Sequence, residues 1–354
     1  ALSAGLLAVP FALAAPAAAA PAVGASVKPI HSLAAAVMQG VGRPDLLLEA
    51  GQSPHTYALT PSEAATLERA DLVVWVGPTL ESFLVRPVRN LARPAASLPL
   101  IQLEGLRVLE TRGGGTWAAH DHGAGGHDHG HDPDHGHSDG HSRDHEHDRS
   151  HDHGHDHAEG GHDPADGHGT AGGTIQGLPA DRVDPHIWLD PENAQRIVSA
   201  LAARLAALDP DNTAAYRANA DALIQRIGDL DAELARTLQP VQDVPYVVFH
   251  DAYHYFEDHY GLRAVGSITL SPDRTPGARR LVEIRDKIAE LDARCVFREP
   301  QFAPDLVQTV VENTPASVAS LDPLGVDHTA GPDAYPQMMR DLGASLRGCL
   351  SPRS

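Results

Sequence analysis

The chain has 354 residues, of which 42% are hydrophobic, so it is long enough for about two ordinary domains with a sizeable core. Lys and Arg number 27 against 47 Asp and Glu, which gives a formal net charge of −20. This balance offers no basic patch for phosphates and excludes a nucleic-acid-binding function. No GxxxxGK[ST] motif is present, so we expect no direct ATP binding.

Residues 1–22 are expected to be the remainder of an export signal peptide. Leu2 to Ala15 form an apolar run, and the alanine-rich stretch after it offers several A-x-A cleavage sites. The run is too short to span ~30 Å of hydrocarbon, and no Cys follows it, so we expect neither a membrane anchor nor a lipid anchor. No later run of about 18 apolar residues occurs, which predicts a soluble mature chain.

Strands and helices alternate in the first part of the chain. The expected strands span 25–30, 45–50, 72–77 and about 100–103, and the expected helices span 31–40, 61–69 and 79–91. The strand at 72–77 (LVVWVG) is wholly apolar, as in a parallel sheet that is covered on both faces. The alternation predicts an α/β lobe made of residues 23–110 together with 178–209.

Residues 111–177 interrupt this alternation, because they consist of Gly, His and Asp with almost no apolar side chains. Such a segment cannot offset its ordering entropy by burial, and we expect it to be disordered. Its central part, 120–168, carries 13 acidic residues against two arginines. Sixteen histidines lie there, and we expect them to act as auxiliary metal ligands: His120, His122, His127, His129, His131, His135, His137, His141, His145, His147, His151, His153, His155, His157, His162 and His168.

The α/β pattern resumes after residue 177. We expect a turn at 184–191, then a helix to Leu208, and a long helix over 211–238 whose apolar residues recur every three or four positions. At ~1.5 Å per residue this helix spans about 42 Å, which suggests a rigid strut (210–240) between two lobes. The second lobe, 241–354, has expected strands at 246–249, 263–270, 295–297 and 317–321 and expected helices at 253–260, 279–291, 304–313 and 334–349.

Three histidines outside the insertion occupy similar places. His55 follows a strand and a loop, His186 lies in DPHIW at the entry to a strand or turn, and His250 ends the strand YVVF. Ligands of open α/β sheets bind beyond the carboxyl ends of the strands, so the three imidazoles could converge in a cleft between the lobes. Neutral imidazoles suit Zn²⁺, whereas Mn²⁺ prefers carboxylates and water.

Six blocks of the sequence resemble the zinc ABC-transporter substrate-binding proteins of the ZnuA family, in the family's order. They are GQSPHTYALTPSEAATLERADLVVWVGPTLESFL, DPHIWLDPENA, VVFHDAYHYFEDHYGL, PGARRLVEIRDKI, CVFREPQF and LDPLG. The resemblance covers about residues 26–350, and the His/Asp-rich insertion matches the zinc branch of the family. It implies two (β/α)₄-type lobes joined by one long helix, with the metal between them.

The resemblance assigns three metal ligands, His55, His186 and His250. Related manganese binders carry a carboxylate at the third position, so His250 points to zinc. Some zinc members have a Glu before the first ligand, but Pro54 stands there in this chain. The fourth ligand is expected to be Asp322, which matches an Asp ligand of the manganese relatives, or else a water or a histidine of the insertion.

The neighbours of these ligands are weaker candidates. Asp251 and Glu299 could accept a hydrogen bond from the second nitrogen of a ligating imidazole, or could serve only in turns and caps. His31 could line the cleft or cap a helix. Asp184 is expected to orient the turn before His186 rather than to bind metal.

Cys295 and Cys349 are the two cysteines of the chain. An even count in an exported protein predicts a disulfide, and two buried free thiols are the alternative. A bridge over this loop would stabilise the fold by roughly 4 kcal/mol.

Three functions remain open at this point. The first is a monomeric periplasmic protein that captures Zn²⁺ as its transported ligand and delivers it to the membrane permease of an ABC importer. The second is a zinc hydrolase, since three histidines with one open position also describe catalytic zinc, although no HExxH motif occurs. The third is a periplasmic zinc buffer that acts through the insertion.

Overall fold

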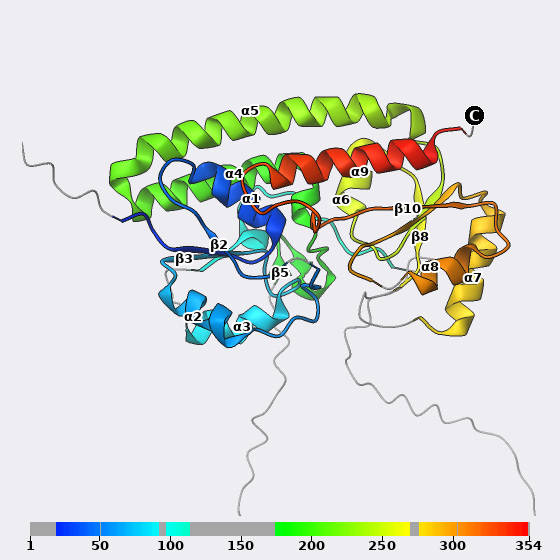
Figure 1. Ribbon diagram of the computed structural model, residues 1–354, viewed down its shortest axis with the longest axis horizontal. Coiled ribbons are helices and arrows are strands. Elements are labelled where there is room, and N and C mark those ends of the chain that lie inside the picture. Colours follow the sequence, from blue (N-terminus) through cyan, green and yellow to red (C-terminus); the bar gives the residue numbers. More distant parts are fainter. Residues whose placement is uncertain are drawn as a thin grey trace, which may run out of the picture. The chain divides into compact units, whose positions relative to one another are not determined.

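Two four-stranded parallel sheets organise the computed structural model (Figure 1). The structure describes residues 19–49, 51–91, 97–113, 174–269, 276–302 and 304–352. The first sheet has the order β2-β1-β3-β4, with β1 Val23–Ala25, β2 Asp45–Leu46, β3 Leu72–Trp75 and β4 Ser97–Pro99. The second has the order β10-β9-β7-β8, with β7 Tyr246–Val248, β8 Ala264–Ser267, β9 Cys295–Arg298 and β10 Ser317–Ser320. The predicted α/β class with two lobes is confirmed.

A layer of four long helices covers both sheets. It contains α1 (Lys28–Val37), α4 (Pro191–Leu208), α5 (Thr213–Leu238) and α9 (Ala334–Leu350), which contact one another. Figure 1 shows α5 running above the two lobes, with α9 below it. The outer faces carry α2 (Pro61–Arg69) and α3 (Val85–Asn90) in the first lobe, and α7 (Ala278–Glu290) and α8 (Asp305–Val311) in the second. The short α6 (His254–Tyr260) follows β7.

The residues of β3 show how the sheets separate two apolar layers. Leu72 and Val74 belong to the large core beneath the helix layer, whereas Val73 and Trp75 belong to a smaller core with α2 and α3. This alternation follows from the two-residue repeat of a strand. The large core continues from the first lobe into the second and includes residues of β7, β9 and α9. The two lobes therefore share one apolar core.

The seven apolar residues predicted to form one stripe on the long helix are all buried. They are Tyr216, Ala220, Leu223, Ile227, Leu230, Leu234 and Leu238. The stripe faces α1, α4 and α9. The long linker helix is thus confirmed, and its packing along the whole helix layer gives it more support than an isolated strut would have.

Several boundaries differ from the sequence-based expectation. The strand expected at 25–30 is wrong beyond Ala25, because Pro29 lies in the first turn of α1, where a missing N–H costs nothing. Residues Leu100–Gln102, expected in a strand, form a 3₁₀ turn after β4. The helix expected at 79–91 is a 3₁₀ turn, Ser82–Leu84, followed by α3.

The described chain resumes earlier than expected after the insertion. Thr174–Ile175 (β5) and Leu178–Pro179 (β6) form a small antiparallel hairpin, although residues up to 177 were expected to be disordered. Residues 1–18 and 114–173, with the expected signal peptide and the sixteen auxiliary histidines, lie outside the described residues. Within the part that is described, no helix is both long and apolar enough to cross a membrane.

The predicted disulfide is present between Cys295 on β9 and Cys349 on α9. Their Cα atoms lie 6.2 Å apart and the bridge closes a loop of 54 residues. Cys295 is fully buried beneath the helix layer. The bridge therefore fastens the last helix to the second sheet.

Polar ties also fasten the second lobe to the first. The buried ammonium of Lys28 on α1 donates hydrogen bonds to the carbonyl oxygens of Gly325 (2.8 Å), Val326 (2.7 Å) and His328 (2.8 Å). Trp188 Nε1 donates to the carbonyl oxygen of Pro323 at 2.8 Å. These bonds hold the loop after β10 against the first lobe.

Candidate metal centre

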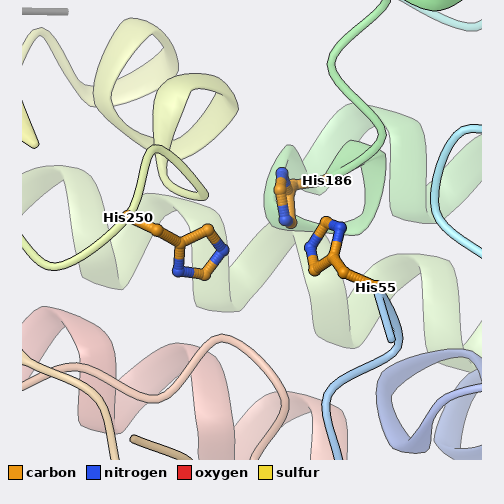
Figure 2. A group of neighbouring side chains, drawn as sticks. All are labelled: His55, His186 and His250. Carbon is orange, nitrogen blue, oxygen red and sulfur yellow. The ribbon is translucent and has the colours of Figure 1, made fainter. Parts of the chain in front are cut away.

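Three imidazoles from separate segments meet between the two lobes (Figure 2). His55 lies in the loop that follows β2, His186 in the turn before α4, and His250 two residues after β7. The ring centroids of His55 and His186 are 5.6 Å apart, those of His55 and His250 5.8 Å, and those of His186 and His250 5.4 Å. The structure thus brings together the three histidines that the sequence singled out.

The spacing of the three rings approaches that of a zinc site. One nitrogen from each ring lies within 4.8 Å of the others. Three nitrogens bound to one tetrahedral Zn²⁺ at ~2.0–2.1 Å lie about 3.3 Å apart. The rings therefore need to approach one another by at most about 1.5 Å to reach this geometry.

His250 is held by a carboxylate from the neighbouring strand. Glu299 directly follows β9, which pairs with β7, so parallel strands place both side chains at the same sheet edge. Glu299 Oε1 lies 2.5 Å from His250 Nδ1, and both side chains are buried. His250 Nε2 is buried and has no hydrogen-bond partner among the described residues. This nitrogen is the one available to a metal.

His186 is held by a carboxylate two positions earlier in the chain. Asp184 Oδ1 accepts a hydrogen bond from His186 N at 3.0 Å and lies 2.8 Å from His186 Nδ1. The same carboxylate therefore shapes the turn, as the sequence predicted, and it also contacts the imidazole, which the sequence did not predict. The local signal is the Asp-Pro-His spacing, since Asp side chains bond backbone two residues on.

The carboxylates act on the pKa values of the site. Burial raises the pKa of Asp184 to about 7, and the charge of Asp251 adds to this effect. Burial works to lower the pKa of His250, but the charge of Glu299 and its hydrogen bond outweigh burial, so the pKa of His250 lies above its ordinary value. The group combines imidazole nitrogens with buried carboxyl groups, which a divalent cation would favour in their ionised form.

The cavity at these rings is small and lined by both polar and apolar side chains. Trp188 packs edge-on against His186, with ring centroids 5.4 Å apart, and Phe302 packs against His250 at 6.1 Å. The cavity measures about 20 Å³, which is little more than one water molecule requires. A cavity of this size suits an ion with a small ligand.

The structure does not bring Asp322 into this group. Asp322 Oδ1 accepts hydrogen bonds from Leu324 N and from Gln301 Nε2, both at 3.1 Å, and Oδ2 accepts one from Val326 N at 2.5 Å. Its two oxygens thus accept hydrogen bonds from the backbone of its own loop and from Gln301, which lies after β9. The three ligand atoms that gather within 4.8 Å all belong to histidines.

Two other candidate neighbours also have different partners. Asp251 pairs with Arg112, so its carboxylate takes part in an ion pair. His31 is buried on α1, where its Nε2 lies 3.0 Å from the carbonyl oxygen of Pro44. Glu299 is therefore the one of these three candidates that holds a ligand ring.

Comparison with known proteins places the chain in a family. A family model described as "Zinc-uptake complex component A periplasmic" matches residues 23–349. The chain belongs to this family, ZnuA. It is 46% identical over 326 residues to the "High-affinity zinc uptake system protein ZnuA" of Brucella suis biovar 1 (strain 1330), covering 92% of this chain and 90% of the relative. It is 34% identical over 348 residues to the protein of that name from Yersinia pestis, covering 98% and 95%.

Solved structures share the ZnuA fold of this chain. A crystal structure of ZnuA superposes with a TM-score of 0.68 at 22% identity, covering 94% of this chain and all of that one. The periplasmic zinc-binding protein TroA from Treponema pallidum also gives 0.68, at 18% identity and the same coverage. The family consists of solute-binding proteins of zinc uptake and not of enzymes, so the hydrolase alternative is excluded.

Proposed function

We propose that this chain captures Zn²⁺ in the periplasm and delivers it to the membrane permease of an ABC-type zinc importer. The observation that carries the proposal is the convergence of His55, His186 and His250 within 4.8 Å, in a chain of the ZnuA family. Zn²⁺ is the cargo of this site. The matching family model describes a periplasmic component, which supports the location, and export by a signal peptide would account for it.

Zinc is the cation that this set of groups suits best. The three ligand positions supply imidazole nitrogens, whereas Mn²⁺ favours carboxylates and water. Asp184 and Glu299 each face an Nδ1, so they fix the tautomer in which Nδ1 carries the proton and Nε2 offers its lone pair. The buried carboxylate of Glu299, 2.5 Å from His250 Nδ1, also strengthens the interaction of that ring with Zn²⁺.

A water molecule is the fourth ligand that we propose. Asp322 already accepts three hydrogen bonds, two from its own loop and one from Gln301, so its recruitment to the metal would leave those donors unsatisfied. Gln301 lines the cavity, and its buried Oε1 has no hydrogen-bond partner among the described residues. An acceptor in this place can bind a hydrogen of a zinc-bound water.

The histidines of the insertion have an auxiliary role in this proposal. Sixteen imidazoles on one segment give many partial sites that load the cleft when zinc is scarce. The tight site of this proposal is the cleft, where the three imidazoles already lie within 4.8 Å of one another. The delivering protein acts as a monomer, because each chain contains a complete set of ligands.

Zinc titration of single variants tests the proposal. His55→Ala, His186→Ala and His250→Ala should each abolish the tight site, measured by competition with a chelator, while His328→Ala should retain it. His328 is a matched control because it pairs with Asp341 outside the cavity. Tight binding that survives all three substitutions would overturn the proposal.

Deletion of residues 114–173 separates cleft binding from the buffer alternative. One tight site should remain in the deleted protein, and its zinc-loading rate at limiting zinc should fall. Loss of all tight binding would make the insertion the primary site. Growth of a zinc-limited strain that depends on the chain for uptake tests delivery, and the His250→Ala variant should fail to support it.

A further inference from the structure

Arg112 joins the turn that carries His250, in the second lobe, to the first lobe. Its Nε donates to Asp251 Oδ2 at 3.0 Å, and its Nη2 contacts Asp251 Oδ1 and lies 2.7 Å from Glu257 Oε2. Asp251 and Glu257 are both buried. Asp251 directly follows His250, and Ala252 N donates to the carbonyl oxygen of His250 at 2.9 Å, so all three residues belong to one tight turn.

The backbone around Arg112 is bonded to the segment that carries His186. Thr111 N donates to the carbonyl oxygen of Arg182 at 2.7 Å, and Asp184 N donates to that of Leu109 at 2.9 Å. Glu110 and Val183 form an antiparallel bridge between these bonds. Arg112 thus extends from a segment that is bridged to the residues just before His186, and it reaches the turn that carries His250.

A guanidinium suits this position for geometric reasons. Its planar fork binds one carboxylate through two N–H groups and still reaches a second one. Glu257 also accepts a hydrogen bond from Tyr246 Oη at 3.1 Å, which fixes the carboxylate that Arg112 contacts. The Arg112 side chain is 19% exposed, so these charge-assisted bonds are largely shielded from water.

We propose that Arg112 is a positioning residue that sets the separation of His186 and His250, and thereby the zinc affinity and coordination geometry of the cleft. It acts through Asp251 and does not touch the metal. The inference rests on the proposed zinc site. It predicts that loss of the contact between Arg112 and Asp251 lowers zinc affinity. Loss of another ion pair between the lobes should not have this effect.

Arg107 supplies a matched control. It lies five residues earlier, and it also joins both lobes, with Nη1 3.2 Å from Asp190 Oδ2 and Nη2 in contact with Asp258 on α6. Neither partner of Arg107 is in the turn of His250. Arg107→Met therefore removes an ion pair between the lobes and leaves the Arg112 tie in place.

The experiment compares Arg112→Met with Arg107→Met in the full chain. Arg112→Met should weaken zinc binding by about 10- to 100-fold, the usual effect of losing a group that supports a metal ligand, and should change the visible spectrum of the Co²⁺-loaded protein. Arg107→Met should leave both the affinity and the spectrum as in the parent, at a comparable melting temperature. An unchanged affinity in Arg112→Met, or an equal loss in both variants, would overturn the inference.

Arg112→Lys keeps the test valid if the Met variant does not fold. Lysine retains the charge but cannot bind Asp251 through two N–H groups while reaching Glu257. Its zinc affinity should fall and its Co²⁺ spectrum should change, although the fold is kept. A Lys variant that binds zinc as the parent does would refute positioning by the fork. If the proposed zinc site is wrong, His186→Ala and His250→Ala would still bind Co²⁺ and Zn²⁺ fully. That outcome is distinct from the outcomes for the Arg112 variants.

Discussion

Substitution of Glu299 by Gln isolates the contribution of one carboxylate to zinc binding. Gln has nearly the same shape and can still accept a hydrogen bond from His250 Nδ1, so the change removes mainly the charge. The contact is short, at 2.5 Å, and the Glu299 side chain is 1% exposed, so solvent screens little of this interaction. We expect Kd for Zn²⁺ to rise by about 10- to 100-fold, which corresponds to about 1.4–2.7 kcal/mol.

At acidic pH, Glu299→Gln also has an effect that favours zinc binding, because it lowers the pKa of His250. The pKa of His250 lies above its ordinary value. Burial opposes this shift, and the charge of Glu299 is the largest cause in its favour. A raised pKa means that protons compete with zinc for His250 at a higher pH in the parent than in Glu299→Gln. The affinity gap between the two proteins should therefore narrow as the pH falls below that pKa.

Chelator competition over a pH series measures both effects. Glu312→Gln is the control, because Glu312 is an exposed carboxylate at the end of α8. Its Kd should match that of the parent at every pH. Equal affinity of Glu299→Gln and the parent at neutral pH, combined with loss of binding in His250→Ala, would refute the claim that Glu299 tunes the ligand ring.

Three further predictions concern the metal preference, the pH and the disulfide. His250→Asp should weaken Zn²⁺ binding relative to Mn²⁺ binding, because it replaces an imidazole by a harder oxygen ligand. Calorimetry with both metals measures this preference, and an unchanged preference would contradict the prediction. Zinc affinity of the parent should fall between about pH 7.5 and 5.5 as imidazoles gain protons, with proton release on binding measured in buffers of different ionisation enthalpy. The Cys295→Ser/Cys349→Ser variant should lose roughly 4 kcal/mol of unfolding free energy in denaturant titrations, while Kd for zinc stays unchanged; a parent-like midpoint would contradict this.

Periodicity predicted the helix layer well because its signal is local. The stripe on α5 contains seven apolar residues, and the same seven are buried in the structure. The bounds of α2, Pro61–Arg69, also agree with the prediction, since Thr60 and Glu63 form a capping box around Pro61. Patterns of this kind depend on residues within one or two turns, which any single sequence contains.

Side-chain direction limited the prediction of the metal centre. Asp322 stands at the position of a ligand in related proteins, yet its carboxylate binds the backbone N–H groups of Leu324 and Val326. Arg112 lay at the edge of the insertion with no recognisable motif, and its partner Asp251 is 139 positions away. A pairing over that distance is fixed by the tertiary fold and leaves no trace in local spacing.

Zinc release requires one ligand segment to move, and the structure favours the His55 loop. The lobes share a continuous core beneath α5, so a wide hinge motion would expose the apolar stripe of that helix. His186 and His250 are buried against carboxylates, whereas His55 is partly exposed and its loop begins at Gly51, with φ of 87°. We expect amide hydrogen exchange in residues 51–60 to slow when zinc binds, while exchange in α5 stays constant. Zinc-dependent protection that appears in α5 and not in this loop would show that the lobes themselves open.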